Sequence, residues 1–210
     1  MPGAMTDASG KTQMKYLIIY AHPNAKSFNH ALKEKIEAAL KASNAAFAVR
    51  DLYEIPFDPA LKAAELEMEE VVPVPDDVKQ EQDYIRSSDV LIFIYPIWWS
   101  DMPAILKGYV DRVFSCGFAW SMEQNVFNGL LQGKKAVIVN TLASSRDDLV
   151  NMGLLECMSK TIDAGIFDFC GIQVIEHKYL CGVLDATAEE RARMLKEVED
   201  MMGKIIGKQA

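Results

Sequence analysis

The stretch Val90-Leu91-Ile92-Phe93-Ile94-Tyr95-Pro96-Ile97-Trp98-Trp99-Ser100-Asp101 decides the fold of this 210-residue chain. It begins with an apolar run about one strand long, which has no polar face and ends at a proline. Runs of this kind are typical of parallel strands that are covered on both faces of a sheet. Two adjacent tryptophans follow at the carboxyl end of the strand, where open α/β sheets bind their ligands. Trp98 and Trp99 either line a site for a flat ligand or belong to the core.

Four more segments have the length and apolar character of strands, and helix-like repeats separate them. This alternation predicts a doubly wound α/β domain with a five-stranded parallel sheet, for which we expect the strand order 2-1-3-4-5. Strands 1 and 3 then flank the point where the order reverses, so their loops share one site with the loop after strand 4. The strands are expected at residues 16–21, 47–52, 89–95, 136–141 and 172–176.

Helix-start signals and apolar spacing organise the segments between the strands. Capping residues are expected at Ser27, at Asp76 or Asp77, at Ser100 or Asp101, and in a capping box formed by Thr187 and Glu190. We expect a short helix within 61–70, an aromatic-bearing loop at 116–133 and a helix at 149–164. Residues 1–13 are expected to be a disordered tail or an addition to the natural sequence, and residues 14–210 a single domain.

Charge and composition exclude several classes of function. The formal net charge of −8 argues against nonspecific binding to nucleic acid, which needs a basic face. The longest apolar run is too short to span a bilayer, and no signal-peptide pattern opens the chain. The four cysteines include no C-x-x-C pair, and no histidine lies at metal-ligand spacing beside them. We therefore expect a cytoplasmic protein without membrane insertion or a metal site, in which the cysteines are small hydrophobes.

The loop after the first strand carries groups that suit a phosphate. It has neither a G-x-G-x-x-G nor a P-loop pattern. It nevertheless leads into a helix N-terminus, whose free amides and macrodipole favour an anion. An N-cap with surface polar residues explains the loop about as well. Taken together with the aromatic residues after the third strand, however, the loop suggests a flat heterocycle on a phosphorylated chain, such as FMN or FAD.

Two motifs resemble those of the flavodoxin-like NAD(P)H:quinone oxidoreductases of the diaphorase type. The segment Ala21-His22-Pro23-Asn24-Ala25-Lys26-Ser27-Phe28-Asn29 resembles their A-H-x-x-x-x-S-F-N signature. The segment from Pro96 to Gly108, continued through 111–114 and 118–120, is similar to their central motif. Shorter matches at 51–53, 57–59 and 169–172 extend the resemblance over about residues 15–176.

The resemblance implies a flavin site with specific candidate residues. The flavin phosphate and ribityl chain would be held by His22, Lys26, Ser27, Phe28 and Asn29. The isoalloxazine would lie against Pro96, Ile97, Trp98 and Trp99, and its pyrimidine edge would meet Asn140, Thr141, Leu142 and Ala143. Trp120 and Phe127 would help to roof the substrate pocket. In this family a second subunit completes that pocket, so a homodimer is expected.

The sequence departs from the family after the fourth strand. The family's T-G-G-like loop is replaced by Thr141-Leu142-Ala143-Ser144-Ser145, whose side chains are expected to narrow the site or move the flavin. The best-known members carry a Tyr and a His after this loop, which stabilise charge on the reduced flavin. Residues 142–165 contain neither type. Arg146 is a candidate replacement, and a solvated loop charge is an equal interpretation of it.

The resemblance implies a two-electron ping-pong reaction, in which hydride passes from NAD(P)H to the flavin and then to a quinone-like acceptor. No nucleophile–base constellation stands out. Two other classes stay open: a flavodoxin-like electron carrier, and a regulatory ancillary subunit of a membrane transporter. The aromatic residues after Cys116 argue against a carrier, which has less need of a roofed pocket. FMN is slightly favoured over FAD because no adenine site is recognisable, and the choice between NADH and NADPH stays open.

Overall fold

The computed structural model describes residues 14–66 and 73–209, and its centre is a parallel sheet of five strands. The strands run in the order β2-β1-β3-β6-β7, which confirms the predicted order because β6 and β7 are the fourth and fifth strands of this sheet. The expected tail at 1–13 lies outside the described residues. The five strands are β1 (Lys15–Tyr20), β2 (Ala46–Asp51), β3 (Val90–Pro96), β6 (Lys135–Thr141) and β7 (Gln173–Leu180).

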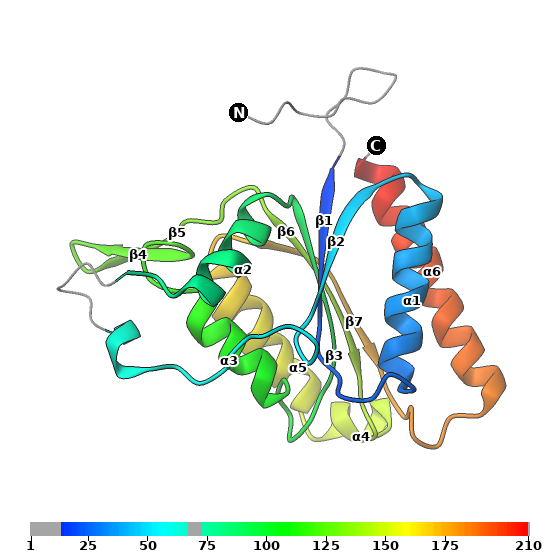
Figure 1. Cartoon of the computed structure of the whole chain (residues 1–210). Coiled ribbons are helices and arrows are strands. Elements are labelled where there is room, and N and C mark those ends of the chain that lie inside the picture. Colours follow the sequence, from blue (N-terminus) through cyan, green and yellow to red (C-terminus); the bar gives the residue numbers. More distant parts are fainter. Residues whose placement is uncertain (1–13, 67–72, 210) are drawn as a thin grey trace.

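Helices cover both faces of the sheet (Figure 1). On one face, α1 (Phe28–Ala42) and α6 (Ala188–Gln209) pack on the side chains that alternate strand residues turn toward them. The other face carries α2 (Asp76–Arg86), α3 (Ala104–Val113) and the π-helix η2 (Lys160–Asp168). Every residue of β3 is buried, as its lack of a polar face predicted.

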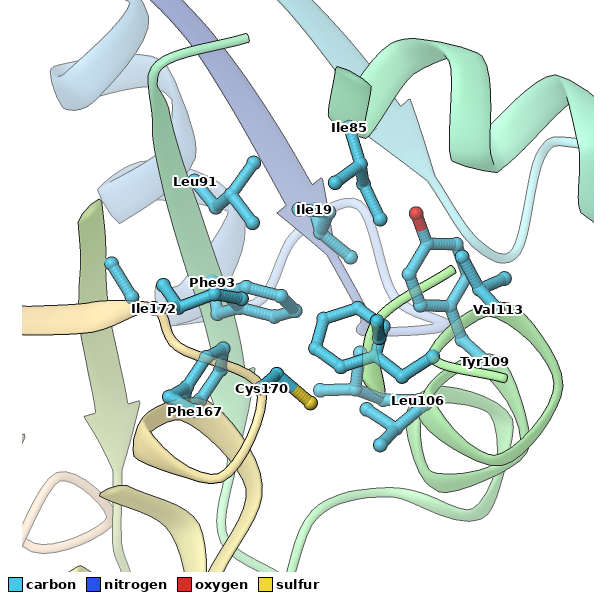
Figure 2. Close-up of a cluster of buried hydrophobic side chains, with 14 of the residues drawn as sticks. Ile19, Ile85, Leu91, Phe93, Leu106, Tyr109, Val113, Phe167, Cys170 and Ile172 are labelled. Carbon is cyan, nitrogen blue, oxygen red and sulfur yellow. The ribbon is translucent and has the colours of Figure 1, made fainter. Parts of the chain in front are cut away.

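The core between the sheet and α3 is rich in aromatic residues (Figure 2). Phe93 of β3 meets Phe167 of η2 edge to face, with the ring centroids 5.0 Å apart. Leu106 and Tyr109 of α3 are fully buried against this layer. Edge-to-face pairs of this kind stabilise a core beyond their buried area, and here they fix η2 beside the sheet.

The region 116–133 contains a β-hairpin where the sequence predicted a loop. β4 (Trp120–Glu123) pairs with β5 (Val126–Gly129) in antiparallel register. The two residues between them, Gln124 and Asn125, both have left-handed φ angles, of 51° and 63°. Two successive left-handed residues give a tight turn the twist that matches the right-handed twist of the two hairpin strands. Gln-Asn is not one of the common glycine-containing turn sequences, so the sequence carries no hairpin signal at this point.

The helix expected at 149–164 is three consecutive pieces. α4 (Arg146–Asn151) ends before Gly153, whose φ of 70° is left-handed and cannot continue the helix. α5 (Leu154–Ser159) follows and passes directly into η2. β7 also reaches Leu180, four residues beyond its predicted end at 176. The expected helix within 61–70 is the 3₁₀ turn η1 (Ala63–Leu66), and residues 67–70 lie outside the described residues.

Two of the predicted helix caps are correct and two are wrong. Ser27 accepts from the His30 amide, and Thr187 and Glu190 form the reciprocal bonds of a capping box. Prolines stand at the N-cap positions of α2 and α3 instead of the predicted carboxylates or serine, because extended backbone is the conformation that proline favours. The Asp101 carboxylate instead accepts from the next amide, that of Met102, at 2.7 Å.

A buried cation fastens the long connection after β2 to α3. Arg112 has a side chain that is 1% exposed. It donates to Glu65 of η1, to Asp77 of α2 and to the Asp58 carbonyl. A buried charge with this many acceptors is fully compensated, and removing any one partner would leave it under-satisfied.

Among the described helices, none combines the length and apolarity that crossing a bilayer requires.

Candidate functional site

Three of the segments predicted to form a site meet at the carboxyl ends of β1, β3 and β6. The Asn29 side-chain amide, on the first turn of α1, donates to Thr141 Oγ1 at 2.7 Å. The Ile97 amide, after β3, donates to the Thr141 carbonyl at 2.9 Å. The rings of His22 and Trp98 lie edge to face with centroids 5.8 Å apart. Residues 22–29, 96–101 and 140–143 therefore border one place.

The loop after β1 is held by its own polar side chains. The Asn24 amide donates to His22 Nδ1 at 3.0 Å, and the Asn24 side chain accepts from the Lys26 amide at 2.8 Å. Partial burial lowers the pKa of His22, so the ring is neutral near pH 7. Because Nδ1 accepts, the single proton lies on Nε2, which remains a donor. The charge of Lys26 is exposed beside it.

The start of α1 offers further donors and one buried acceptor without a partner. The amides of Phe28 and Asn29 open the helix, so they precede the first possible intrahelical acceptors. Asn29 is 3% exposed, and no other described group hydrogen-bonds its Oδ1. A buried polar atom left in this way costs about 1–3 kcal/mol. This orphaned acceptor fits a group that donates a hydrogen bond into the site, as the ribityl hydroxyls of a flavin do.

The two tryptophans stand on a strained turn and are not core residues. Trp98 and Asp101 exchange backbone hydrogen bonds at 2.9 and 3.1 Å, which closes a two-residue turn. The central residues, Trp99 and Ser100, have φ angles of 52° and 62°. Trp98 is 42% exposed and Trp99 completely exposed, so the interpretation that they are only core is wrong. Strained backbone that presents a large apolar ring to solvent is typical of ligand sites.

The end of β6 is fixed by a polar network that sequence reasoning missed. Asn140 is fully buried, and its Oδ1 lies 2.7 Å from His177 Nε2. His177 Nδ1 lies 2.6 Å from Asp163 Oδ1, and the imidazole stacks on Tyr179 at 4.1 Å. The expected strand ended at 176 and so did not bring His177 to the site, whereas the observed β7 carries this histidine. Residues 177–180 read His-Lys-Tyr-Leu and do not alternate, so no sequence pattern marks the longer strand.

Other residues of the β6 loop lie differently from the expectation. Leu142 is 4% exposed and packs with Leu149 and Leu155, so its side chain does not narrow the site and only its backbone borders it. Ala143 is exposed. Arg146 is the first residue of α4 and is exposed, with its guanidinium against the Cys181 thiol.

Trp120 and Phe127 do not join the other site residues within one chain. They lie on the β4–β5 hairpin and form a cluster with Phe169, with ring centroids 5.5–6.0 Å apart. The Trp120 indole donates to the carbonyl of Phe114, just after α3, and Leu131 bonds Cys170, shortly before β7. These anchors place the cluster near the amino ends of β6 and β7, away from α4 and the carboxyl ends (Figure 1). Phe169 was not predicted as a member.

Comparison with known proteins agrees with this geometry. A family model described as flavodoxin-like fold matches residues 14–202. An NAD(P)H oxidoreductase of Haemophilus influenzae, itself described as uncharacterized, is 38% identical over 164 residues, which cover 78% of this chain and 81% of that protein. NAD(P)H dehydrogenase (quinone) 1 of Cavia porcellus is 35% identical over 200 residues, which cover 85% of this chain and 72% of that protein.

Among solved structures, an NAD(P)H:quinone oxidoreductase from Methanothermobacter marburgensis superposes with a TM-score of 0.80 at 29% identity, covering 92% of this chain and 97% of that one. The family model matches most of the chain, and the sequence identity to these relatives points to the same family. The chain belongs to the flavodoxin-like NAD(P)H:quinone oxidoreductase family.

Proposed function

We propose that this chain is a flavin-dependent NAD(P)H:quinone oxidoreductase with a two-electron ping-pong cycle. Flavin supplies the redox chemistry by accepting hydride from NAD(P)H and releasing it to a quinone-like acceptor. The observation that carries the proposal is the convergence of a donor-rich helix start, an exposed tryptophan turn and the end of β6 at one edge of the sheet. The names of the relatives, NAD(P)H oxidoreductase and quinone dehydrogenase, support the same reaction class.

The first loop would hold the phosphate and ribityl chain. His22 Nε2, the hydroxyl of Ser27 and the opening amides of α1 are the donors, and Lys26 adds a positive charge. Phe28 would pack beside the chain, and Asn29 Oδ1 would gain the donor that it lacks. Satisfying that atom on binding would recover part of the cost of burying it.

The second and third segments would hold the ring system. Pro96, Ile97, Trp98 and Trp99 form the wall, and the exposed indole of Trp99 offers a face for stacking. Asn140, Thr141, Leu142 and Ala143 would meet the polar edge of the ring, Leu142 through its backbone. We favour FMN over FAD, because no group beyond the phosphate loop is arranged for an adenine among the described residues. Mass spectrometry of the released flavin decides between them.

A second copy of the chain would complete the acceptor pocket. The cluster of Trp120, Phe127 and Phe169 is apolar and partly exposed, and the hairpin β4–β5 lies away from the carboxyl ends of the strands, where the tryptophan turn of its own chain is (Figure 1). A groove of about 670 Å³ beside it is lined by apolar side chains, Leu66, Val74 and Met122 among them, and by the charged Glu65, Asp111 and Arg112. Exposed apolar surface of this extent suits a subunit interface. We therefore propose a homodimer in which Trp120 and Phe127 roof the partner's site.

The remaining expectations stay part of the proposal. The chain from residue 14 onward would act as a single domain in the cytoplasm, and it would bind neither nucleic acid nor a membrane. The four cysteines are unpaired, which suits a reducing compartment.

The test is spectroscopic. The purified protein should be yellow or become so with added flavin, NAD(P)H should bleach it rapidly, and menadione should restore the colour with steady turnover. A colourless protein that binds no flavin and oxidises no NAD(P)H contradicts the proposal. Bound flavin that NAD(P)H does not bleach would instead identify an electron carrier.

A further inference from the structure

A histidine–carboxylate pair lies directly behind the proposed flavin edge, in residues that the proposed reaction does not yet use. His177 of β7 and Asp163 of η2 approach to 2.6 Å, and their side chains are 7% and 28% exposed. Asp163 lies in a nine-residue π-helix. Such helices are rare, and they are frequent at functional sites because the extra residue per turn re-aims side chains.

Hydrogen-bond roles in this network are fixed by what each group can donate. The Tyr95 carbonyl can only accept, so Asn140 turns its Nδ2 toward it, at 3.3 Å, and its Oδ1 toward His177. His177 Nε2 must then donate. The Asp163 carboxylate also accepts, so the bond from His177 Nδ1 contains a second proton. The ring and the carboxylate together form an imidazolium–carboxylate pair whose two charges cancel.

The neighbouring phenols do not alter this charge balance. Burial raises the pKa of Tyr179 to about 12 and also raises the pKa of Tyr95, so both are neutral. Tyr179 stacks on the imidazole and bonds Ser159 through its hydroxyl at 3.3 Å. The His177 ring is therefore covered on one side by an aromatic ring and on the other by η2, while Asp163 stays partly exposed.

The strand register places the network under the site. Asn140 pairs with Tyr95 on one side and with Tyr179 on the other, one residue before the strands end at Pro96, Thr141 and Leu180. Thr141 is the residue that contacts both Asn29 and Ile97. Asn140 thus links the buried pair to the point at which the three loops meet.

We propose that His177 is a positioning residue for the flavin: it holds the Asn140 amide in one orientation and cancels the negative charge of Asp163 behind the edge where a reduced flavin carries its own. This inference rests on the proposed flavin site. The pair then takes the place of the Tyr and His that the family places after β6. An uncancelled carboxylate that is only partly exposed to water would disfavour a second negative charge nearby.

The experiment compares the flavin reduction potential of three variants with that of the wild type. His177→Gln keeps a donor for Asn140 and leaves Asp163 uncancelled, so reduced flavin should bind about tenfold more weakly relative to oxidised flavin. For a two-electron couple this lowers the potential by about 30 mV. The double variant H177Q/D163N removes both charges and should recover most of the loss. Lys178→Gln is the matched control, because it removes a cation one residue away that pairs with Glu197 of α6 on the other face.

Each result has a defined meaning. An unchanged potential in His177→Gln overturns the inference, and so does a double variant shifted as far as the single one, which is what a merely structural role predicts. A shift in Lys178→Gln as large as in His177→Gln also overturns it, because the effect would then be one of net charge. A wild type that binds no flavin contradicts the proposed function itself, which is a distinguishable failure.

A second measurement does not need flavin or a variant. Nitrogen-15 NMR of the histidine rings in the flavin-free protein reports how many ring nitrogens carry a proton. Protons on both nitrogens of His177 at neutral pH support the pair. A single protonated nitrogen means that the Asn140 amide is turned over or that Asp163 carries the second proton, and either result overturns the charge assignment even if the variants fail to fold.

Discussion

Trp99 combines a left-handed backbone with a fully exposed indole, and neither property stabilises the free protein. This backbone conformation lowers the stability of the fold by about 1–2 kcal/mol when the residue has a side chain. Glycine adopts it without this loss. We expect the free energy of unfolding of Trp99→Gly to be about 1 kcal/mol higher than that of Trp99→Ala. Urea denaturation of the flavin-free proteins measures it. Both variants lose the same exposed ring, so the difference isolates the backbone. Equal stabilities would show that the turn relaxes when the indole is removed.

Trp99 and Trp120 should have different roles, the first in binding the flavin and the second in turnover of the acceptor. If the indole of Trp99 stacks on the flavin, Trp99→Ala should weaken flavin binding about tenfold, which corresponds to about 1.4 kcal/mol. Trp120→Ala should leave the flavin dissociation constant within about twofold and lower acceptor turnover instead. Fluorescence titration with flavin and steady-state kinetics with menadione measure the two effects. The reverse ranking would mean that the roles of the two tryptophans are exchanged.

At the residue scale, the sequence predicted a role correctly where that role depends only on neighbouring residues in the chain. Ser27 as a cap depends on the neighbouring helix alone, and the structure confirms it. His177 was missed because its partners, Asn140 and Asp163, lie 37 and 14 residues away. The choice between core and site for the tryptophans was left open, because a turn with two left-handed non-glycine residues has no sequence signature.

Gly108 sets how closely α3 approaches the connection after β2. A Cβ on Gly108 would lie 2.6 Å from the Pro59 Cβ and closer still to the Pro59 carbonyl oxygen. Gly108→Ala should therefore destabilise the fold by about 1–3 kcal/mol, although the same change usually stabilises a helix. Gly203→Ala in α6 is the control, because nothing lies within 4 Å of its added Cβ. It should gain about 0.5–1 kcal/mol in the same thermal or urea unfolding experiment.

If both glycine variants gained stability, the connection would yield to α3 without cost. That result would also weaken the role of Arg112, which fastens the same connection through Glu65 and Asp77. The two observations are therefore linked: the glycine permits the approach, and the buried ion pairs hold it.

Elements with a strong period were predictable, and those with competing signals were not. The five strands and α1, α3 and α6 follow apolar spacing. The hairpin at Trp120–Gly129 was not predictable in this way, because its turn is Gln124-Asn125 and its strands are only four residues long. The break at Gly153 was overlooked since the apolar spacing continues across it, and a π-helix has a period that a search at 3.6 residues does not detect.

At the scale of the whole molecule, the order of the sheet brings the candidate site residues together. Placing β1 beside β3 puts His22 against Trp98, and placing β6 beside β3 puts Thr141 against Ile97. Both adjacencies followed from the predicted order. The position of Trp120 did not, because it depends on how a hairpin outside the sheet packs on α3 and Phe169, which strand order does not determine.

The separation of Trp120 and Phe127 from the tryptophan turn gives the proposed homodimer a test. Phe127 is 55% exposed, so Phe127→Glu should fold normally while placing a charge in the proposed interface, where burying it is costly. We expect it to sediment as a monomer at micromolar concentration, to bind flavin about as well as the wild type, and to lose at least tenfold in quinone turnover. Ala38→Glu, exposed on α1 across the molecule, should leave the dimer and its turnover intact. A Phe127→Glu protein that remains a dimer with full turnover would place the interface elsewhere, and the acceptor pocket would then have to be closed by the described residues of a single chain.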